Sequence, residues 1–462
     1  MPGFFYYCIR LMNKKLYIYF LFVNILLSGY YIDLWHNANT VSRLLPVKTI
    51  VENGTMCIDQ YHEQTIDKAL INGHYYSEKA PLPAFIVTPF YYFAYHSGLS
   101  KSLKDDDVLF MLGSILIGMI PFVLIVMLIF HSLVKAQWNI YKAMLLSLLL
   151  SYSTFVFIYV GTSFSHVMAA LWVLLSFIFL KEKKKYMLAG LFTGLAFITE
   201  YPTGLILFLW PFLLYLQTKQ LKPVVLFYTG VLPSLLVQLG YNYIYTGNPM
   251  DMLYNHQAID FYHDPNTFIG FALPIPEAMW KLLVGFYRGL LFHAPILFLI
   301  FWLIGKEVIQ SPSTSLKNYV LPLFILSYLL FSSYRVWYGG WCFGPRHFVP
   351  VTVLLIYYYA KNLEFKGIKG WMIALLSTTG ILYIWLAKIT LQYSINADYP
   401  NTLTDLLIPA YRDYNFNLNN FMSRFYFTDP KTAAFYWLLL FFIACLFPFY
   451  FGFFRKAGAN KT

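Results

Sequence analysis

Long runs of apolar residues alternate with short polar connections along most of the 462-residue chain. A helix that crosses a lipid bilayer needs about 20 mostly apolar residues, with a range of about 17–25. Runs of this kind, some of them short, predict about twelve membrane-spanning helices, at residues 16–34, 108–130, 143–160, 162–180, 187–199, 201–217, 223–246, 290–304, 318–334, 347–360, 370–388 and 433–453. The pattern therefore predicts an all-α, polytopic membrane protein.

The apolar segment 81–99 is an exception to this assignment. It contains Pro81, Pro83 and Pro89 and is rich in tyrosine, and proline inside a helix removes a hydrogen bond and clashes with the preceding turn. Counting it as a span would also place the lysine-rich stretch 181–185 outside the cytoplasm, against the usual enrichment of Lys and Arg in cytoplasmic loops. We therefore expect segment 81–99 to lie on the outer membrane surface, as a juxtamembrane or re-entrant element.

The composition supports a chain that mostly faces lipid. Of its residues, 59% are hydrophobic and 12% are charged, about half the charged fraction of a soluble domain, which is roughly 25%. The formal net charge of +12 does not indicate nucleic-acid binding, because the basic residues concentrate in short connections that the topology assigns to the cytoplasm. With a cytoplasmic N-terminus and a retained first span, three long loops fall outside, at residues 35–107, 247–289 and 389–432.

The first outer loop carries the densest set of acids, bases and tyrosines in the chain, namely Arg43, Asp59, His62, Glu63, Asp67, Lys68, His74, Tyr75, Tyr76, Glu78 and Lys79. This mixture indicates transfer of a group to a hydroxyl or an amine. A carboxylate would take the acceptor proton as general base, and Arg or Lys would hold the phosphate of an activated donor. Substrate contacts are expected from His62, His74, Tyr75 and Tyr76. The alternative is a solvated loop whose charges only face water.

The end of this loop resembles a known family. Residues 73–83, GHYYSEKAPLP, contain Lys79-Ala80-Pro81-Leu82 with Tyr75 and Tyr76 just upstream. This stretch is similar to the Lys-Pro-Pro-Leu type element of the GT-C superfamily of membrane glycosyltransferases, and to bacterial relatives of protein O-mannosyltransferases and of the aminoarabinose transferases that act on lipid A. The resemblance implies a helical membrane bundle, a sugar donor carried on a polyprenyl phosphate and an inverting transfer on the outer face. It implies that Lys79 contacts the donor phosphate, whereas a lysine snorkelling at the interface is the alternative.

One feature of that family is missing here. An Asp-Glu pair usually follows the first span, shortly before an arginine, but residues 39–43 read NTVSR and contain no acid. Arg43 matches the family's arginine and is expected to bind the donor phosphate. The nearest acids are Asp33 and Asp59, and we expect Asp59 to be the catalytic base, with Asp67 as the second candidate. The missing pair leaves open a different base, or a chain without activity.

Two polar residues lie at the outer ends of short predicted spans. His166 follows a turn where members of the family carry an Asp or a His, and it is expected to bind the donor phosphate or to orient the base. The alternative is a helix N-cap with a bystander histidine. Glu200 lies between two short apolar segments, where an acid is costly unless it faces water or a partner. It is therefore expected to contact substrate, or else to pair with a buried Arg or Lys.

Two arginines lie beside glycine and aromatic residues where outer loops re-enter the membrane. Arg288 occurs in GFYRGL and Arg346 in WYGGWCFGPRH. A helix N-terminus favours an anion and arginine adds a bidentate fork, so both are expected to bind the donor phosphate. Tyr338 and Trp341 would stack on sugar faces. An aromatic belt with an anchoring arginine is the alternative.

No metal or cofactor site is expected. The four cysteines are far apart and form no CxxC motif, although Cys57 and Cys342 both fall outside the cytoplasm and would be able to form a disulfide. His256 and His263 lie near two aspartates and would suit a divalent cation, but a hydrated loop is the favoured interpretation. No glycine-rich nucleotide loop is present, which fits a lipid-linked donor.

The sequence thus predicts a glycosyltransferase that moves a sugar from a polyprenyl-phosphate donor to a lipid, glycan or protein acceptor, with no nucleic-acid partner. The catalytic module would span residues 1–289, followed by C-terminal transmembrane helices at 290–462. We expect an integral protein of a bacterial inner membrane, with its active site on the periplasmic or extracellular face. The main alternative is a transporter or flippase of a lipid-linked saccharide, in which Glu200 would be a coupling site. A non-catalytic scaffold is a further alternative.

Overall fold

Helices make up nearly all of the structure. The computed structural model describes residues 2–32, 37–99, 105–259, 270–390, 400–413, 422 and 429–454, and within them the β-structure is a two-stranded hairpin with isolated bridges. Asp33 and His263, named above, lie outside these residues. The all-α prediction is confirmed, with a small hairpin that the sequence analysis did not foresee.

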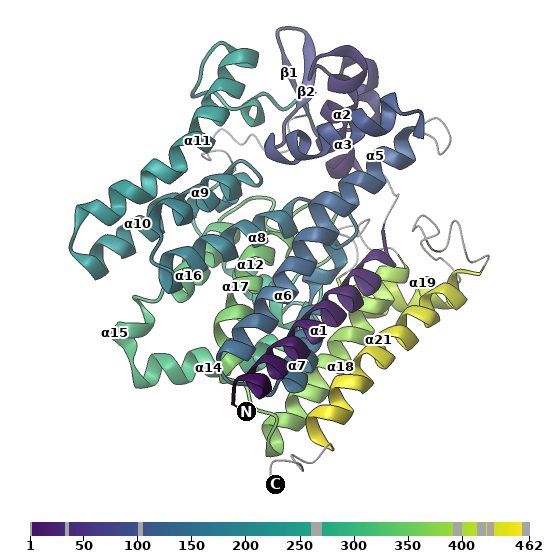
Figure 1. The fold of residues 1–462 in the computed structure, drawn as a ribbon. Coiled ribbons are helices and arrows are strands. Elements are labelled where there is room, and N and C mark those ends of the chain that lie inside the picture. Colours follow the sequence, from purple (N-terminus) through teal and green to yellow (C-terminus); the bar gives the residue numbers. More distant parts are fainter. Residues whose placement is uncertain are drawn as a thin grey trace.

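One group of helices lies side by side along one flank of the molecule (Figure 1). It consists of α1 (Pro2–Gly29), α6 (Ile120–Lys135), α7 (Ile140–Tyr152), α18 (Gly367–Ile389) and α21 (Pro430–Phe453). Buried hydrogen bonds join these helices. The Tyr152 hydroxyl donates to Asn24 Oδ1 at 3.1 Å, and the Trp437 indole N–H donates to the Leu27 carbonyl at 2.9 Å. Such bonds satisfy polar groups that lipid cannot.

A second group of helices packs against the first. Its longer members are α8 (His166–Phe177), α9 (Tyr186–Phe197), α10 (Leu205–Thr218), α11 (Leu221–Thr246), α14 (Leu297–Gln310), α16 (Val320–Ser332) and α17 (Val349–Tyr359). Short helical elements lie between the longer helices of both groups, namely η3 (Phe155–Tyr159), η4 (Ile178–Glu182), η5 (Tyr201–Gly204), η6 (Leu253–His256), α12 (Pro276–Val284), α13 (Leu290–His293), α15 (Pro312–Ser315), η7 (Arg346–Phe348), η8 (Ala360–Asn362), η9 (Thr402–Leu407) and α19 (Ile408–Arg412). The predicted span 290–304 is interrupted, because Pro295 separates α13 from α14.

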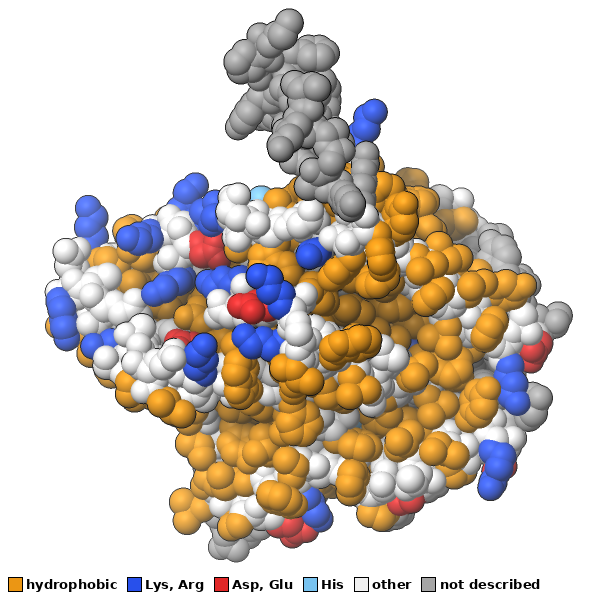
Figure 2. Space-filling view, turned by 90° about the horizontal axis from the view of Figure 1, so that it is seen from below, with side chains coloured by type: hydrophobic (Ala, Val, Ile, Leu, Met, Phe, Trp, Pro, Cys, Tyr) orange, Lys and Arg blue, Asp and Glu red, His pale blue; other side chains and the backbone are white. Residues whose placement is uncertain are grey.

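The outer surface of this bundle is apolar. Ile18, Phe22 and Leu26 follow one another by one turn of α1 and are 58%, 58% and 51% exposed, and hydrophobic side chains cover much of the face in Figure 2. A surface of this kind is stable against lipid and not against water. In the described part of the chain, four helices are long and apolar enough to cross a membrane, namely Asp106–Lys135, Leu221–Thr246, Gly367–Ile389 and Lys431–Phe453. The chain is an integral membrane protein, whereas the number of twelve spans stays a prediction.

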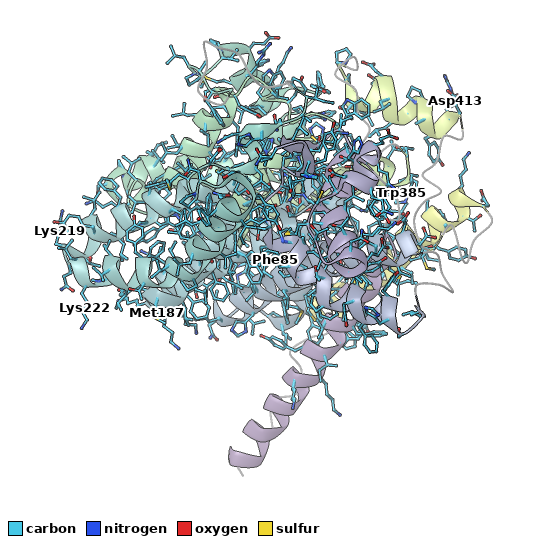
Figure 3. All side chains as sticks on the ribbon, turned by 90° about the horizontal axis from the view of Figure 1, so that it is seen from above. Phe85, Met187, Lys219, Lys222, Trp385 and Asp413 are labelled. Atoms are coloured by element: carbon cyan, nitrogen blue, oxygen red, sulfur yellow. The ribbon has the colours of Figure 1, made fainter. Side chains whose placement is uncertain are left out.

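Polar connections lie at opposite edges of the molecule. Lys219, between α10 and α11, and Lys222, in the first turn of α11, occupy one edge in Figure 3, and Asp413, after α19, lies at the other, with Trp385 nearer to it. The predicted topology assigns the first connection to the cytoplasm and the second to the outer side. The assignment of these two connections to opposite sides of the membrane stays a prediction.

The first outer loop folds into a unit of its own, at the top of Figure 1. It contains α2 (Ala38–Asn53), η1 (Asp59–Gln64), β1 (Lys68–Ile71), β2 (His74–Ser77) and α3 (Leu82–His96), followed by α5 (Asp105–Gly113), which η2 (Ser114–Met119) joins to α6. Its core includes the buried residues Leu44, Val87, Tyr91 and Leu109. α3 has 15 residues, about 22 Å of helix, which is too short for a hydrocarbon core of about 30 Å. The placement of segment 81–99 on the outer membrane surface stays a prediction, since α7 and α9, which lie in predicted spans, are shorter still.

The hairpin closes through a tight turn. Asn72 and Gly73 have φ values of 52° and 85°, the left-handed pair that a two-residue type I′ turn needs. Tyr76 on β2 packs against Tyr245 of α11, with ring centroids 4.9 Å apart. The hairpin is therefore held between the loop unit and the second group of helices.

Glycines allow α9 and α11 to approach closely. Gly190 and Gly194 on α9 form a GxxxG pattern, the spacing that lets membrane helices pack backbone to backbone. A Cβ atom added at Gly190 would lie 1.8 Å from the Phe227 carbonyl oxygen, and one added at Gly230 would lie 1.9 Å from the Met187 carbonyl oxygen. This contact matters for the site because α9 ends just before Glu200.

The close packing predicts a specific loss of stability. Replacing Gly190 by alanine is expected to lower the melting temperature of the purified protein in detergent, because the added methyl group forces the two helices apart. Overpacking of this kind costs about 1–3 kcal/mol, occasionally more. The matched control is Gly240→Ala on α11, where an added Cβ meets nothing within 4 Å. It should leave the melting temperature unchanged or slightly higher, since alanine favours helix over glycine by about 1 kcal/mol. Equal effects of both substitutions would contradict this account.

Candidate active site

Arg43 on α2 and Glu200 form an ion pair that joins the first outer loop to the helix bundle. α2 begins at an N-cap, Asn37, whose side chain accepts from the backbone N–H groups of Asn39 and Thr40. One turn later the Arg43 Nε donates to Asn39 Oδ1 at 3.0 Å, and its Nη2 donates to Glu200 Oε1 at 2.6 Å. The Arg43 side chain is 3% exposed and that of Glu200 13%. Glu200 therefore has the buried arginine partner that was one of its two expected roles.

The same Glu200 oxygen binds the start of α8. The Ser165 hydroxyl donates to Glu200 Oε1 at 2.5 Å, and His166 Nδ1 lies 3.2 Å from it. Glu200 itself lies where α9 has ended and η5 begins. One carboxylate oxygen thus fixes α2, the start of α8 and the break after α9 relative to one another.

The open end of the hairpin carries Asp67, Glu78 and Lys79. Because Lys68 pairs with Ser77, Asp67 just before β1 and Glu78 just after β2 emerge next to each other. Lys79 Nζ lies 2.8 Å from Asp67 Oδ2 and donates to Glu78 Oε1 at 2.5 Å. The other Glu78 oxygen accepts from Gln257 Nε2 at 2.5 Å. Strand register therefore places two carboxylates around one ammonium group.

Arg346 reaches this region from the C-terminal part of the chain. Its guanidinium carbon lies 5.9 Å from the ring centroid of Phe164, close to His166 in sequence. The rings of His166 and His347 have centroids 5.8 Å apart. The positive charge of Arg346 helps to lower the pKa of Asp67. The structure thus brings Arg43, Asp67, Lys79, His166, Glu200 and Arg346 together in a group that we call the basic cluster.

The two carboxyl groups at the hairpin end respond oppositely to this environment. Burial alone would raise the pKa of Asp67, but the charge and hydrogen bond of Lys79, with the charges of Arg346 and Arg43, lower it below its ordinary value of 3.8. Burial, together with the neighbouring Asp67 charge, raises the pKa of Glu78 above 4.5, despite the opposing effects of Lys79 and Gln257. Asp67 is therefore an ionised carboxylate at neutral pH.

Some buried nitrogens of this region lack a hydrogen-bond acceptor within the protein. Among the described residues, Arg43 Nη1, His166 Nε2 and His347 Nε2 are buried and have no hydrogen-bond partner. Leaving such a group unsatisfied costs about 1–3 kcal/mol, and more for a charged group. An anionic ligand in the basic cluster would satisfy donors of this kind.

Asp59 lies at the other end of the hairpin from Asp67. Its Oδ2 is 2.6 Å from His74 Nδ1, and its Oδ1 accepts from the Tyr75 backbone N–H at 2.5 Å. Burial favours a higher pKa for Asp59, but the hydrogen bonds from His74 and from the Tyr75 backbone lower it below 3.8. Asp59 and His74 therefore form a separate pair near the turn end of the hairpin.

The other loop residues proposed as substrate contacts pack within the hairpin unit. His62 stacks on Tyr75 with ring centroids 4.1 Å apart and an interplanar angle of 12°. Lys68 Nζ donates to the His62 carbonyl at 2.7 Å. Tyr76 faces Tyr245, as described above. These contacts hold His62, Tyr75 and Tyr76 within the hairpin unit, and their role as substrate contacts stays a prediction.

The Arg288 guanidinium donates hydrogen bonds to backbone carbonyls of the loop that precedes Arg346. Its Nε, Nη1 and Nη2 donate to the carbonyls of Tyr338, Cys342 and Gly340 at 2.8, 2.6 and 2.9 Å. Arg288 is fully buried, so it serves as a clamp on this loop. The Tyr338 ring is partly buried, and the Trp341 side chain is 68% exposed.

The disulfide between Cys57 and Cys342 is not formed, because both residues are free cysteines. Cys342 is fully buried and its thiol donates to backbone carbonyls of Tyr338 and Gly344. His256 pairs with Asp251 at 2.7 Å, and its proposed companion His263 lies outside the described residues.

Two residues of this region were not among the site residues expected from sequence. Glu78 and His347 are the chain neighbours of Lys79 and Arg346. A signal for Glu78 was present in its position beside a lysine at the end of a polar loop. Nothing in the sequence alone distinguishes His347 from an interfacial histidine.

The match of this chain to known proteins is distant. No model of a known protein family matches it, and no curated protein does. Among solved structures, it is similar to the crystal structure of the Archaeoglobus fulgidus oligosaccharyltransferase in the apo form, with a TM-score of 0.46 and 13% sequence identity. That similarity covers 93% of this chain and 60% of the archaeal chain. The function proposed below is therefore inferred from the distances and hydrogen bonds of the site and not from this similarity.

Proposed function

We propose that the chain is a GT-C type glycosyltransferase that takes a sugar from a polyprenyl-phosphate donor on the outer side of the membrane. The observation that supports this best is the cationic environment of Asp67, in which Lys79 lies 2.8 Å from the carboxylate and the charges of Arg346 and Arg43 help to lower its pKa. These three cations come from distant parts of the sequence. A cationic group beside an ionised carboxylate suits a reaction in which a phosphate leaves while a proton is removed from the acceptor.

In the proposed reaction, an acceptor oxygen attacks the anomeric carbon of the sugar from the side opposite the phosphate. The bond between that carbon and the phosphate oxygen breaks, and the polyprenyl phosphate leaves with the electron pair. Asp67 takes the acceptor proton. Arg43, Lys79 and Arg346 stabilise the anion that leaves, and the attack from the opposite side inverts the configuration of the sugar.

Asp67 is the better base because of where it lies. Its carboxylate is 2.8 Å from the Lys79 ammonium group and within the field of Arg346, whereas Asp59 is engaged by His74 near the turn end of the hairpin. This reverses the order of the two candidates that the sequence suggested. Asp59 instead lies beside Cys57 and His74.

Glu200 acts as a positioning residue in this proposal. Its hydrogen bond fixes Nη2 of Arg43, which leaves Nη1, a buried nitrogen with no partner in the described protein, to bind the phosphate. His166 Nε2 is a second buried nitrogen near the same place. The transporter alternative used Glu200 as a coupling site, but its carboxylate oxygen already accepts hydrogen bonds from Arg43 and Ser165, which favours a positioning role.

Replacing the proposed base, Asp67, should lower the rate of sugar transfer without unfolding the protein. Asp67→Asn is expected to lower kcat by about 10²–10⁴-fold, because an amide cannot accept the acceptor proton. Transfer is measured with detergent-purified protein as release of polyprenyl phosphate from a panel of polyprenyl-phosphate monosaccharides, with membranes of the producing cell as the acceptor source. The matched control is Glu63→Gln, an exposed acid in η1, which should keep wild-type transfer.

Two outcomes of that assay would change the assignment. If Asp59→Asn abolishes transfer while Asp67→Asn retains it, the base is Asp59. If the wild-type protein gives no turnover with any donor but moves the intact lipid across vesicles, the flippase alternative replaces the proposal.

The phosphate contact of Lys79 predicts a change in donor affinity. Lys79→Ala should raise the KM for the donor by about 10–100-fold, since a hydrogen bond to a charged group is worth about 1.5–3 kcal/mol. The matched control is Lys68→Ala in the same hairpin, whose ammonium group is held by the His62 carbonyl. Initial rates at varied donor concentration give both values, and a larger KM change for Lys68→Ala than for Lys79→Ala would refute this role.

A further inference from the structure

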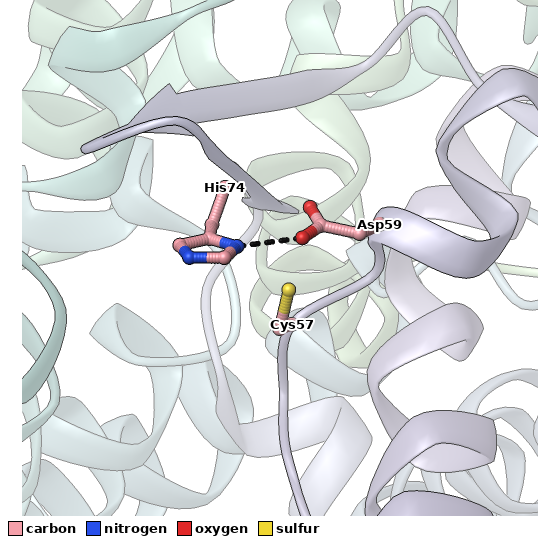
Figure 4. A group of neighbouring side chains, drawn as sticks. All are labelled: Cys57, Asp59 and His74. Atoms are coloured by element: carbon pink, nitrogen blue, oxygen red, sulfur yellow. Dashed lines mark hydrogen bonds and ion pairs between the residues drawn. The ribbon is translucent and has the colours of Figure 1, made fainter.

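Three side chains of metal-binding type meet at the turn end of the hairpin. The Cys57 sulfur, an Asp59 carboxylate oxygen and a His74 ring nitrogen lie within 4.8 Å of one another. Figure 4 shows the Cys57 thiol directed toward the hydrogen bond between His74 and Asp59. None of the three belongs to the basic cluster.

The backbone holds these three side chains in place. Cys57 and Asp59 lie on either side of Ile58, whose side chain is fully buried and whose N–H donates to the Tyr75 carbonyl at 2.8 Å. The Tyr75 N–H in turn donates to Asp59 Oδ1. His74 is the first residue of β2, directly after the Asn72-Gly73 turn. Two backbone segments are therefore fixed against each other, with Cys57 and Asp59 on one and His74 on the other.

We propose that Cys57, Asp59 and His74 bind a zinc ion. A thiolate sulfur, an imidazole nitrogen and a carboxylate oxygen are the ligands that Zn²⁺ uses in proteins, whereas Mg²⁺ and Ca²⁺ take oxygen ligands. Three protein ligands leave a coordination position for water. On binding, Cys57 releases its thiol proton to solvent, and His74 carries its proton on Nε2 so that Nδ1 is the ligand.

An ion pair between His74 and Asp59 would account for only two of these residues. It gives no reason for a thiol at the same point, and Cys57 is only partly buried, so it is not simply a small apolar residue of the core. A metal site uses all three side chains. The sulfur ligand also makes the site selective for a borderline-soft cation.

The ion would brace the hairpin. It would join the segment after α2 to the start of β2, while the opposite end of the same hairpin presents Asp67, Glu78 and Lys79. Binding of Zn²⁺ would therefore stabilise the folded loop unit, as any ligand that binds only the native state does. Zinc binding does not depend on the transferase activity proposed above.

The test uses the full-length protein, purified in detergent and stripped of metal with a chelator. Titration with Co²⁺ is expected to give a thiolate-to-cobalt charge-transfer band that saturates at an equimolar amount. Zn²⁺ should displace Co²⁺, abolish the band and raise the melting temperature of the wild-type protein.

Variants identify the ligands. Cys57→Ser and His74→Ala should each remove the cobalt band and weaken Zn²⁺ binding by about 100-fold or more, since even changes behind the ligands cost about 10–100-fold. The His74 side chain is 60% exposed, so its removal leaves the fold intact and keeps the test valid if Cys57→Ser misfolds. The matched control, Cys445→Ser, replaces a free cysteine of α21 and should keep the band.

The absence of a saturable cobalt band in the wild-type protein would overturn the zinc site, as would a band that survives in both Cys57→Ser and His74→Ala. Binding of Co²⁺ by a protein that transfers no sugar would leave the zinc site standing and contradict only the proposed transferase function. The two proposals therefore fail separately.

Discussion

The buried ion pair between Arg43 and Glu200 is the contact on which the arrangement of the site depends. Two charges taken out of water stabilise a structure only when they are well paired, and removing one partner costs about 3–5 kcal/mol because the other is left uncompensated. Here the pair joins α2 to the break after α9, and Ser165 adds the start of α8 to the same carboxylate oxygen. The close packing of α9 on α11, made possible by Gly190 and Gly230, holds the acid in position.

The hairpin supplies the other half of the basic cluster through its register. Side chains alternate between the two faces of a strand, so a slip of one residue would turn Asp67 and Glu78 away from each other. The Asn72-Gly73 turn fixes the register, because a type I′ turn of two residues determines which residues pair. A two-residue turn at one end of the hairpin thus decides whether Lys79 meets Asp67 at the other.

The sequence predicted the helical membrane architecture, because apolar run length is a local property. The hairpin was missed although Asn72-Gly73 is a strong hairpin signal; its strands have four residues each, too few to show a clear alternation. The choice between Asp59 and Asp67 was not decidable from sequence, since both acids lie in the same polar stretch. The pairing of β1 with β2 places Asp67 at the open end of the hairpin, and the contacts of Asp59 with His74 and Tyr75 place it near the turn end.

Arg288 and Arg346 show why sequence context alone cannot assign a phosphate-binding role. Both follow glycine and aromatic residues. The Arg288 guanidinium, however, donates hydrogen bonds to the backbone carbonyls of Tyr338, Gly340 and Cys342. Those carbonyls belong to the loop that leads into Arg346, so the first arginine shapes the backbone that presents the second. A guanidinium whose N–H groups already meet backbone acceptors has few left for a ligand. The capacity of an arginine to bind phosphate therefore depends on the acceptors that the fold has already placed around it.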